Sequence, residues 1–452
     1  MTAHEAVLAV SAPLEVRGIV EGFYGRPWSP EQRLDMVDFI AELGMNTYVY
    51  SPKDDPFTRR RWREPYGAEA TEGLRALTER ARGAGVSLWY GLSPGLSMHY
   101  AEPGDVAAVR AKLDTVRALG FTDIALFLDD IPWRLQHPGD LAAFPDLVSA
   151  QLSLIRALET STAAGRLAVC PTLYCGRGNE PYIAALGRGL APQTELFWTG
   201  RAICSPELDA ADAEIFAGAT GHRPLYWDNF PVNDVAMTGE LHIGPYFGRD
   251  PRLSATAAGV IANPMPLAEA SKIGLASVAD FARDPAGFEP EASWEAALLR
   301  VAGARDYDAF REFADAFRGS ALCTDDAPRL GAALGRFAFR YEFDHRASAV
   351  SELRDELHRL ADVALRMLHL ENRALGAEIA PWVAQYAAGI EALLAAIDGL
   401  APRGAGGPPE LMGVARERVA ARLGALRATG LRAFGDLVDM FLSDLIGEFS
   451  SR

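Results

Sequence analysis

The feature that most constrains the fold is an alternation of short apolar runs with helical patterns, repeated eight times between residues 17 and 276. Short strands that alternate with helices indicate βα units around a parallel sheet. Eight units in roughly 260 residues is the usual size of a TIM barrel, whose catalytic groups lie at the carboxyl ends of the strands. We therefore predict a (β/α)8 barrel. The expected strands span residues 17–22, 47–50, 87–91, 123–128, 167–171, 195–198, 224–227 and 259–262.

A second, all-helical region is predicted from residue 285 onwards, where strand-like runs disappear and Ala, Leu, Arg and Glu predominate. Apolar residues recur there every three or four positions, which is typical of the buried face of a helix. One such stripe contains Leu353, Leu357, Leu360, Ala364 and Met367. Residues 402–409, rich in glycine and proline, are expected to form a turn between two helices. The predicted domains are an N-terminal extension (1–16), a catalytic barrel (17–284) and a helical domain (285–452).

The net charge of −16 argues against nucleic acid or an anionic membrane as partner, because both are bound chiefly through clustered Lys and Arg. We recognise neither a signal-peptide pattern in the first thirty residues nor an apolar stretch that approaches the length of a membrane span. We therefore expect a cytoplasmic protein. The four cysteines lack paired metal-ligand spacing and are expected to be core thiols. They are Cys170, Cys175, Cys204 and Cys323.

The strongest local motif is Asp129-Asp130, at the end of the apolar run 123–128. Successive strand residues point to opposite faces, so both carboxylates can face one site only where the strand curls, as it would at the mouth of a barrel. On this motif alone two alternatives stay open: one aspartate caps the next helix, or the pair binds a divalent metal ion. Because no third acid with suitable spacing accompanies the pair, we expect no metal. The sequence shows no phosphate loop or dinucleotide fingerprint, so we expect no cofactor.

Polar and aromatic residues follow several other predicted strands. A sugar site needs flat rings as walls for the C–H faces and side-chain amides or carboxylates as partners for the hydroxyls. Each residue also has a purely structural explanation: a turn, a helix cap, a surface ion pair between Lys53 and its acidic neighbours, or a core position for Trp227. The residues in question are Gly22, Lys53, Tyr174, Trp227, Asn229, Asp234 and Asn263.

Several motifs resemble, in their order and spacing, those of the O-GlcNAcases of glycoside hydrolase family 84. They are VEGFYGRPW (20–28), NTYVYSPKDDP (46–56), WRE (62–64), LDDI (128–131), PTLYCG (171–176), WDN (227–229) and ND (233–234). The resemblance covers the predicted barrel and implies a retaining exo-β-N-acetylglucosaminidase. The helical remainder resembles the stalk-like domain of that family only in its general character.

The resemblance also implies a role for each site residue. Asp129 corresponds to the carboxylate that orients and polarises the acetamido N–H of the substrate, and Asp130 to the general acid and base. Tyr174 corresponds to a group near the acetamido group and the anomeric centre, and Trp227 to a wall of the acetamido pocket. The implied sugar-hydroxyl ligands are Gly22, Lys53, Asn229, Asp234 and Asn263.

These roles agree with substrate-assisted catalysis, an exception among retaining glycosidases. Consecutive carboxylates approach one side of a sugar more readily than both faces, so the acetamido oxygen of the substrate is the expected nucleophile. We expect the two carboxyls to titrate as a coupled pair, with one of them protonated to higher pH. The expected partners are a glycoprotein or glycan that bears β-GlcNAc and a second copy of the chain, bound through the helical domain.

Two alternative functions are weighed against this one. A hyaluronidase or a cell-wall-fragment hexosaminidase would share the barrel and the acetamido pocket, but the acidic charge disfavours polyanionic hyaluronan. A catalytically silent sugar-binding or scaffold protein would need no acid beside a polarising carboxylate. The Asp129-Asp130 pair therefore argues against that class.

Overall fold

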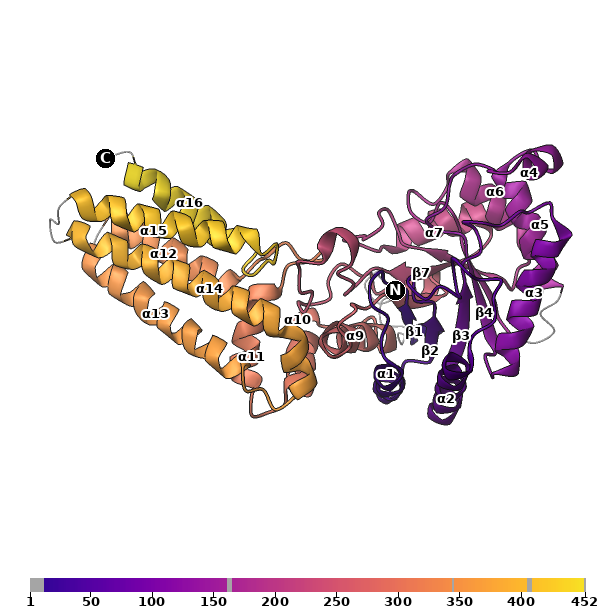
Figure 1. Ribbon diagram of the computed structural model, residues 1–452, viewed down its shortest axis with the longest axis horizontal. Coiled ribbons are helices and arrows are strands. Elements are labelled where there is room, and N and C mark those ends of the chain that lie inside the picture. Colours follow the sequence, from indigo (N-terminus) through magenta and orange to yellow (C-terminus); the bar gives the residue numbers. More distant parts are fainter. Residues whose placement is uncertain (1–11, 161–164, 344, 405–408, 451–452) are drawn as a thin grey trace, which may run out of the picture. The chain divides into compact units, whose positions relative to one another are not determined.

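The computed structural model describes residues 12–160, 165–343, 345–404 and 409–450. Eight parallel strands form a closed barrel in which each strand pairs with the next and β8 pairs with β1 (Figure 1). The predicted strands agree with these to within one residue at each end, which confirms the (β/α)8 barrel. The strands are β1 (Val16–Glu21), β2 (Thr47–Tyr50), β3 (Ser87–Leu92), β4 (Asp123–Phe127), β5 (Leu167–Cys170), β6 (Glu195–Trp198), β7 (Pro224–Asp228) and β8 (Gly259–Ala262).

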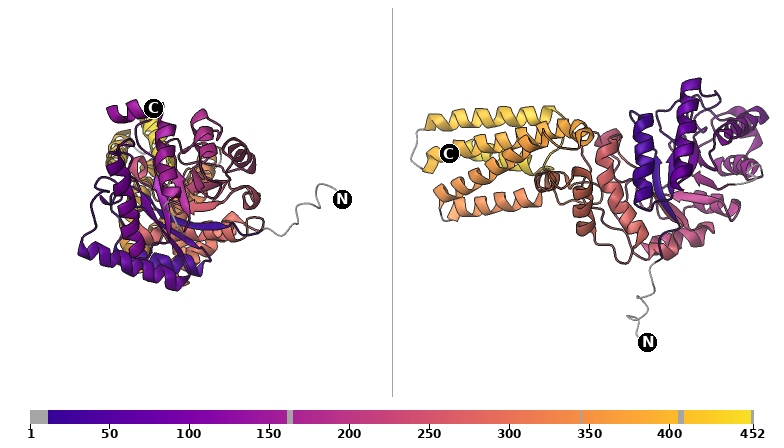
Figure 2. Two further views of the ribbon diagram at one scale, coloured as in Figure 1. Left: turned by 90° about the vertical axis from the view of Figure 1, so that its right-hand side faces the viewer. Right: turned by 90° about the horizontal axis from the view of Figure 1, so that it is seen from below.

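Helices between the strands cover the outside of the barrel (Figures 1 and 2). The first of them begins with a capping box: Ser29 accepts the backbone N–H of Gln32, and Gln32 accepts that of Ser29. This reciprocal pair satisfies two N–H groups that the helix cannot pair itself. The helices are α1 (Pro30–Glu42), α2 (Ala68–Ala84), α3 (Pro103–Ala118), α4 (Pro138–Ala143), α5 (Leu147–Glu159), α6 (Pro181–Gly189), α7 (Ala210–Thr220), α8 (Leu253–Thr256) and α9 (Ala268–Arg283).

Side chains that point inward from the strands fill the barrel. They form one buried cluster that includes Val20, Val49, Phe127, Phe197 and Trp227. The rings of Phe127 and Phe197 both meet Trp227 edge-on, with centroids 5.2 and 5.9 Å away. The barrel is therefore a packed core, and a substrate can reach only its ends.

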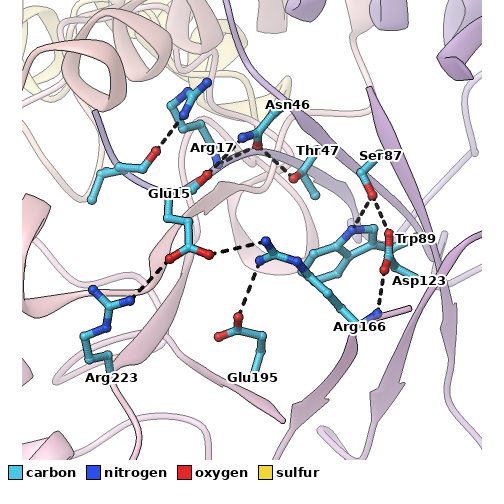
Figure 3. Close-up of polar contacts among 11 residues, drawn as sticks. Glu15, Arg17, Asn46, Thr47, Ser87, Trp89, Asp123, Arg166, Glu195 and Arg223 are labelled. Atoms are coloured by element: carbon cyan, nitrogen blue, oxygen red, sulfur yellow. Dashed lines mark hydrogen bonds and ion pairs between the residues drawn. The ribbon is translucent and has the colours of Figure 1, made fainter. Parts of the chain in front are cut away.

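Polar groups tie the strands together at their amino ends (Figure 3). Asp123 accepts hydrogen bonds from Ser87 and from the backbone N–H of Arg166 (2.6 Å). Arg166 and Arg223 form ion pairs with Glu15 at 3.3 and 3.4 Å. These ion pairs are exposed and add little stability individually, but together with Asp123 they join neighbouring strands. We assign this end of the barrel to stability, and the opposite end to chemistry.

The chain divides into two compact units. The barrel unit runs to residue 234 and includes residues 247–268 and 275–290, whereas the helical unit comprises residues 235–246, 269–274 and 291–452. The predicted domain limits stay a prediction, and residues 1–11 of the predicted extension lie outside the described residues. The helical unit contains α10 (Pro290–Ala302), α11 (Tyr307–Ala314), α12 (Pro328–Phe343), α13 (Arg346–Met367), α14 (Arg373–Gly404), α15 (Pro409–Ala428) and α16 (Leu437–Ser450), with short 3-10 helices at Val235–Met237 and Asp315–Phe317.

Two sequence expectations about the helical unit can be compared with the structure directly. The predicted apolar stripe from Leu353 to Met367 is buried along α13, as expected. Part of the turn predicted at residues 402–409 is helical, because α14 continues to Gly404 and α15 begins at Pro409. Residues 405–408 lie outside the described part of the chain.

The expectation that no apolar stretch approaches the length of a membrane span was wrong. Among the described residues one helix, Arg373–Leu400 within α14, is long and apolar enough by length and composition, with a mean hydropathy of 1.3. The reason is its position in the helical unit, where it packs against α13, α15 and α16. A helix that is covered on several sides is apolar around most of its circumference. Over half of its most apolar window, 56%, is buried inside the protein.

Candidate active site

The site begins where β4 ends. Leu128 extends the hydrogen-bond ladder between β4 and β5 by one bond, from its N–H to the carbonyl of Cys170 (2.9 Å). Asp129 and Asp130 come next in the sequence. Asp130 has a φ of 52°, a left-handed conformation that a residue with a Cβ rarely adopts. The chain therefore leaves the extended conformation between the two aspartates. Lys53 forms an ion pair with Asp129, and its nitrogen lies 6.0 Å from the ring centroid of Tyr24, which binds Asp130, so both carboxylates face the same side of the barrel mouth.

The helix-cap alternative for the aspartate pair is wrong. The next helix, α4, begins at Pro138 with His137 at its N-cap, so neither aspartate caps it. The ammonium group of Lys53 forms an ion pair with Asp129, and a cation in that place competes with a divalent metal ion for the same oxygens. The pair is thus not explained by local structure.

Lys53, in the loop after β2, is buried and donates a hydrogen bond to Oδ2 of Asp129. The alternative of a surface ion pair with its acidic neighbours is wrong: Asp54 accepts the N–H of Gly25, and Asp55 accepts the hydroxyl of Tyr50. The other oxygen of Asp129, Oδ1, is buried and has no hydrogen-bond partner among the described residues. A buried carboxylate oxygen without a donor is costly, so this atom is suited to accept a ligand N–H.

Two tyrosines hold the carboxylate of Asp130. Tyr24 donates to Oδ2 (2.7 Å), and Tyr174, in the loop after β5, donates to Oδ1 (2.9 Å). Arg59 donates to the hydroxyl of Tyr24 (2.7 Å) and to the backbone carbonyl of Asp130 (3.3 Å). This arrangement fixes the direction of the Asp130 side chain before any ligand binds.

These contacts shift the pKa values of Asp130 and Lys53. Partial burial raises the pKa of Asp130, but Lys53, the two tyrosine hydroxyls and Arg59 outweigh it and lower that pKa below its ordinary value. Burial lowers the pKa of Lys53, but Asp129 and Asp130 outweigh it and raise that pKa. The expectation that mutual repulsion keeps one carboxyl protonated to higher pH is therefore wrong for Asp130 in the substrate-free protein, because nearby cations and hydrogen-bond donors offset the repulsion.

Gly22 and Trp227 form a close contact beside Lys53. Trp227 lies on β7, is buried in the barrel core, and has its ring centroid 5.6 Å from the Lys53 nitrogen. A Cβ at Gly22 would lie 2.5 Å from the Trp227 ring, closer than real Cβ atoms approach other atoms. Position 22 therefore needs glycine for close approach, not only for a turn. Trp227 is both a core residue and a neighbour of the site.

Two asparagines extend the site from Trp227. Oδ1 of Asn229 accepts the indole N–H of Trp227 (2.8 Å) and the amide of Asn263 (2.9 Å), and its own amide donates to the carbonyl of Ile203 (2.8 Å). Oδ1 of Asn263 is buried and has no partner among the described residues, so it can accept from a ligand hydroxyl. Asn229 and Asn263 are therefore more than turn residues.

Asp234 joins the other side of the site, because its Oδ2 accepts the backbone N–H of Tyr24 (2.7 Å). Burial raises the pKa of Asp234. The structure thus brings the predicted site residues together through direct contacts at the carboxyl end of the strands. They are Gly22, Lys53, Asp129, Asp130, Tyr174, Trp227, Asn229, Asp234 and Asn263.

Comparison with known proteins identifies the family. The model of the beta-N-acetylglucosaminidase family matches residues 17–315. The chain belongs to this family. Curated relatives in the β-N-acetylglucosaminidase family include the protein O-GlcNAcases of Rattus norvegicus and Mus musculus, each 34% identical over 269 residues. Those residues are 58% of this chain but only 29% of the relatives, so the chain spans under a third of their length.

Solved structures agree with this family assignment. An O-GlcNAc hydrolase of Thermobaculum terrenum, solved as a mutant, is 30% identical to the chain, with a TM-score of 0.88 over 96% of this chain and 94% of that one. The protein CpGH84B is 24% identical, with a TM-score of 0.84 over 96% of this chain and 77% of its own. At that identity it supports the fold alone. The resemblance seen in the sequence motifs is thereby confirmed.

Three residues of this β-N-acetylglucosaminidase-family site were not predicted from the sequence. Tyr24 and Arg59 contact Asp130, and Arg249 forms a buried ion pair with Asp228 at the end of β7 (2.5 and 2.9 Å). Tyr24 lies inside the recognised segment 20–28, and Arg59 opens a run of arginines after β2, so both had a local signal. Arg249 had no local sequence signal, because its partner Asp228 lies 21 positions away and meets it only in the folded protein.

Proposed function

We propose that this protein is a retaining exo-β-N-acetylglucosaminidase of the O-GlcNAcase type, which hydrolyses terminal β-linked GlcNAc. The observation that supports this most directly is the pair of consecutive carboxylates, Asp129 and Asp130, which face one side of the barrel mouth around Lys53. One of them has a buried oxygen without a donor, and the other is held by two tyrosines. Asp129 is therefore suited to accept a substrate N–H, and Asp130 is held in place for proton transfer.

The geometry favours a nucleophile that belongs to the substrate. Retaining glycosidases with a protein nucleophile place one carboxyl on each side of the scissile bond, about 5–5.5 Å apart. Here both carboxylates come from one strand end and share Lys53 as a neighbour. The acetamido oxygen of GlcNAc then attacks C1, while the free oxygen of Asp129 accepts the acetamido N–H and makes that oxygen more nucleophilic.

The proposed reaction has two steps, and Asp130 acts in both. In the first step, Asp130 gives its proton to the departing oxygen as the C1–O bond breaks. The acetamido oxygen bonds to C1, and the acetamido N–H proton passes to Asp129, which leaves a neutral oxazoline. In the second step, the Asp130 carboxylate takes a proton from water as the water attacks C1. The bond from C1 to the ring oxygen breaks, and Asp129 returns its proton to the nitrogen. Each step inverts C1, so the product keeps the β configuration.

The acid role requires that the bound substrate raise the pKa of Asp130, which is lowered in the free protein. A sugar that covers the carboxylate removes water from it, and desolvation of a carboxyl raises its pKa. The proton needed for the first step is therefore held in the complex with substrate. This requirement gives the proposal a distinctive pH dependence.

The remaining site residues are proposed to recognise the sugar. Gly22, Lys53, Asn229, Asp234 and Asn263 bind its hydroxyls, and the free Oδ1 of Asn263 is one prepared acceptor. Tyr174 lies near the acetamido group and the anomeric centre, and Trp227 forms a wall of the acetamido pocket. A wall of this kind selects the N-acetyl group, since it offers an apolar surface to the methyl group.

We also propose the biological setting. The net charge of −16 disfavours hyaluronan, a polyanion, as substrate, so a glycoprotein or a neutral glycan is the proposed bearer of GlcNAc. All four cysteines are thiols in the structure, which supports a reducing compartment such as the cytoplasm. A scaffold without catalysis is disfavoured, because binding alone does not need Asp130 fixed by two tyrosines.

The test compares an aryl β-N-acetylglucosaminide with the matching aryl β-glucoside, which lacks the acetamido group. We expect hydrolysis of the first only, and the β-anomer of GlcNAc as the first product in a proton NMR time course. Equal rates on the two substrates would exclude the substrate-assisted step. An α-anomer as first product would exclude retention, and no hydrolysis of either substrate would favour the scaffold alternative.

A further inference from the structure

The strand end that bears the two aspartates is held by a buried hydrogen-bond network behind the site. In a regular parallel ladder, the bond from Leu128 N–H to the Cys170 carbonyl is followed by one from Thr172 N–H to the Leu128 carbonyl. Here the backbone N–H of Thr172 donates instead to the hydroxyl of Tyr182 (3.0 Å). The Leu128 carbonyl accepts the side-chain hydroxyl of Thr172 (2.8 Å). At this position of the ladder, the side-chain hydroxyl of Thr172 thus replaces its backbone N–H as the donor to Leu128.

Gln151, on α5, closes the network into a ring. Its Oε1 accepts the hydroxyl of Tyr182 (2.5 Å), and its Nε2 donates to Oγ1 of Thr172 (2.7 Å). Gln151 is fully buried, and Thr172 is 3% exposed. The single hydroxyl hydrogen of Thr172 is therefore directed to the Leu128 carbonyl, because its oxygen already accepts from Gln151. The direction of every bond in the ring is fixed.

We propose that Gln151, Thr172 and Tyr182 are positioning residues for Asp129 and Asp130, an inference that rests on the proposed function. The carbonyl of Leu128 belongs to the same planar peptide unit as the nitrogen of Asp129. A hydrogen bond to that carbonyl therefore fixes the orientation of the peptide plane before Asp129, and with it the direction of the Asp129 side chain. Arg59 holds the carbonyl of Asp130 (3.3 Å), so the peptide units on both sides of the pair are fixed.

The left-handed φ of Asp130, 52°, is the reason that such support is needed. A non-glycine residue in this region is strained and persists only where its surroundings determine it. Without the Thr172 hydroxyl, the Leu128 carbonyl loses its partner and the peptide before Asp129 can rotate. The Asp130 carboxylate would then move away from Tyr24 and Tyr174, although none of the proposed sugar ligands has changed.

The test replaces Thr172 by valine, which has the same shape but neither donates nor accepts a hydrogen bond. We expect kcat to fall by about 10- to 100-fold, the order of loss that a misplacement of about 1 Å causes at a catalytic group. KM should change far less, because the proposed ligands of the sugar hydroxyls lie on other loops. Thr172→Ser keeps the hydroxyl and should recover most of the activity.

Thr78→Val is the matched control. Thr78 is a buried threonine on α2 whose hydroxyl lies 2.7 Å from each of two backbone carbonyls, those of Arg75 and Leu119. Among the described residues it has no hydrogen bond to a proposed site residue. It should lower the thermal midpoint as Thr172→Val does, but leave kcat at the wild-type value. If Thr172→Val does not fold, Tyr182→Phe opens the same ring at a half-buried position and should lower kcat less.

The measurements are kcat and KM on an aryl β-N-acetylglucosaminide, the thermal midpoint, and crystal structures of the wild type and Thr172→Val. An unchanged kcat in folded Thr172→Val would overturn the inference, and so would an equal loss in Thr78→Val. If the wild type does not cleave the substrate, the proposed function fails. The crystal structures still decide the positioning role, since an Asp130 carboxylate that stays on Tyr24 and Tyr174 in Thr172→Val overturns it.

Discussion

The hydroxyl of Tyr174 donates a hydrogen bond of 2.9 Å to Oδ1 of Asp130. Tyr24 occupies the second oxygen of the same carboxylate, and Lys53 lies nearby, so the free protein stabilises the ionised form of its proposed general acid. Burial and Asp130 together raise the pKa of Tyr174 itself, which keeps its hydroxyl a donor at neutral pH. In the proposed mechanism, Asp130 is therefore a carboxylate in the free protein and takes up its proton when substrate binds.

The first prediction concerns pH. The profile of kcat/KM reports ionisation in the free enzyme, whereas that of kcat reports the complex. We expect the basic limb of kcat/KM at lower pH than the basic limb of kcat. In Tyr174→Phe one donor to the Asp130 carboxylate is lost, so the pKa of Asp130 rises and the basic limb of kcat/KM moves to higher pH. Steady-state kinetics across pH measures both limbs.

Tyr386→Phe is the control for this experiment. Tyr386 is buried on α14, and its hydroxyl has no hydrogen-bond partner among the described residues. Its loss should leave both limbs where they are. The pH argument fails if Tyr174→Phe moves the basic limb to lower pH or if both tyrosine variants move it equally.

A second prediction separates the two aspartates. Asp130→Ala should slow substrates with poor leaving groups far more than activated aryl substrates, by about 10²–10⁴-fold, which is the usual value of general acid assistance. Asp129→Ala should slow both kinds to a similar degree, because Asp129 acts on the nucleophile. The measurement is kcat/KM over aryl β-GlcNAc substrates of graded leaving-group pKa. A steeper dependence in Asp129→Ala would reverse the assignment.

The third prediction concerns the ion pair between Arg249 and Asp228. Both side chains are almost fully buried, at 0% and 3% exposure, at the end of the strand that precedes Asn229. Arg249→Met leaves the Asp228 carboxylate buried without its cation, and breaking such a pair costs about 3–5 kcal/mol. Arg252→Met removes an exposed partner of Asp250 and should cost about 0–1 kcal/mol. Denaturant unfolding gives both free energies, and equal losses would contradict the prediction.

The fourth prediction concerns self-association through the helical unit, which stays a proposal. Phe339 and Phe343 are 65% and 73% exposed on α12, one turn apart, with ring centroids 5.3 Å from each other. Aromatic residues, Phe included, are enriched at protein interfaces, and truncation of a hot-spot residue there costs about 2 kcal/mol or more. Sedimentation equilibrium should show a dimer that Phe339→Ser with Phe343→Ser weakens and that Leu96→Ser, on the barrel, does not. A monomer at high micromolar wild-type concentration would refute the dimer.

The sequence by itself determined the secondary structure and the order of the barrel. The eight strands were predicted to within one residue, because each is a short apolar run bounded by turns. The capping box at Ser29 and the buried stripe on α13 follow from equally local patterns. The pair Asp129-Asp130 was also recognised, since an apolar strand that ends in two carboxylates is unusual.

Only the tertiary structure decided which side chains meet and how they ionise. Tyr24 reaches Asp130 across 106 positions and Asp234 across 210, and Lys53 reaches Asp129 across 76. Local patterns do not encode such pairs, because they form only when closure of the barrel brings the ends of distant strands together. The pKa of Asp130 is lowered for the same reason: its value depends on cations and hydroxyls supplied by other loops, not on its neighbour in the sequence.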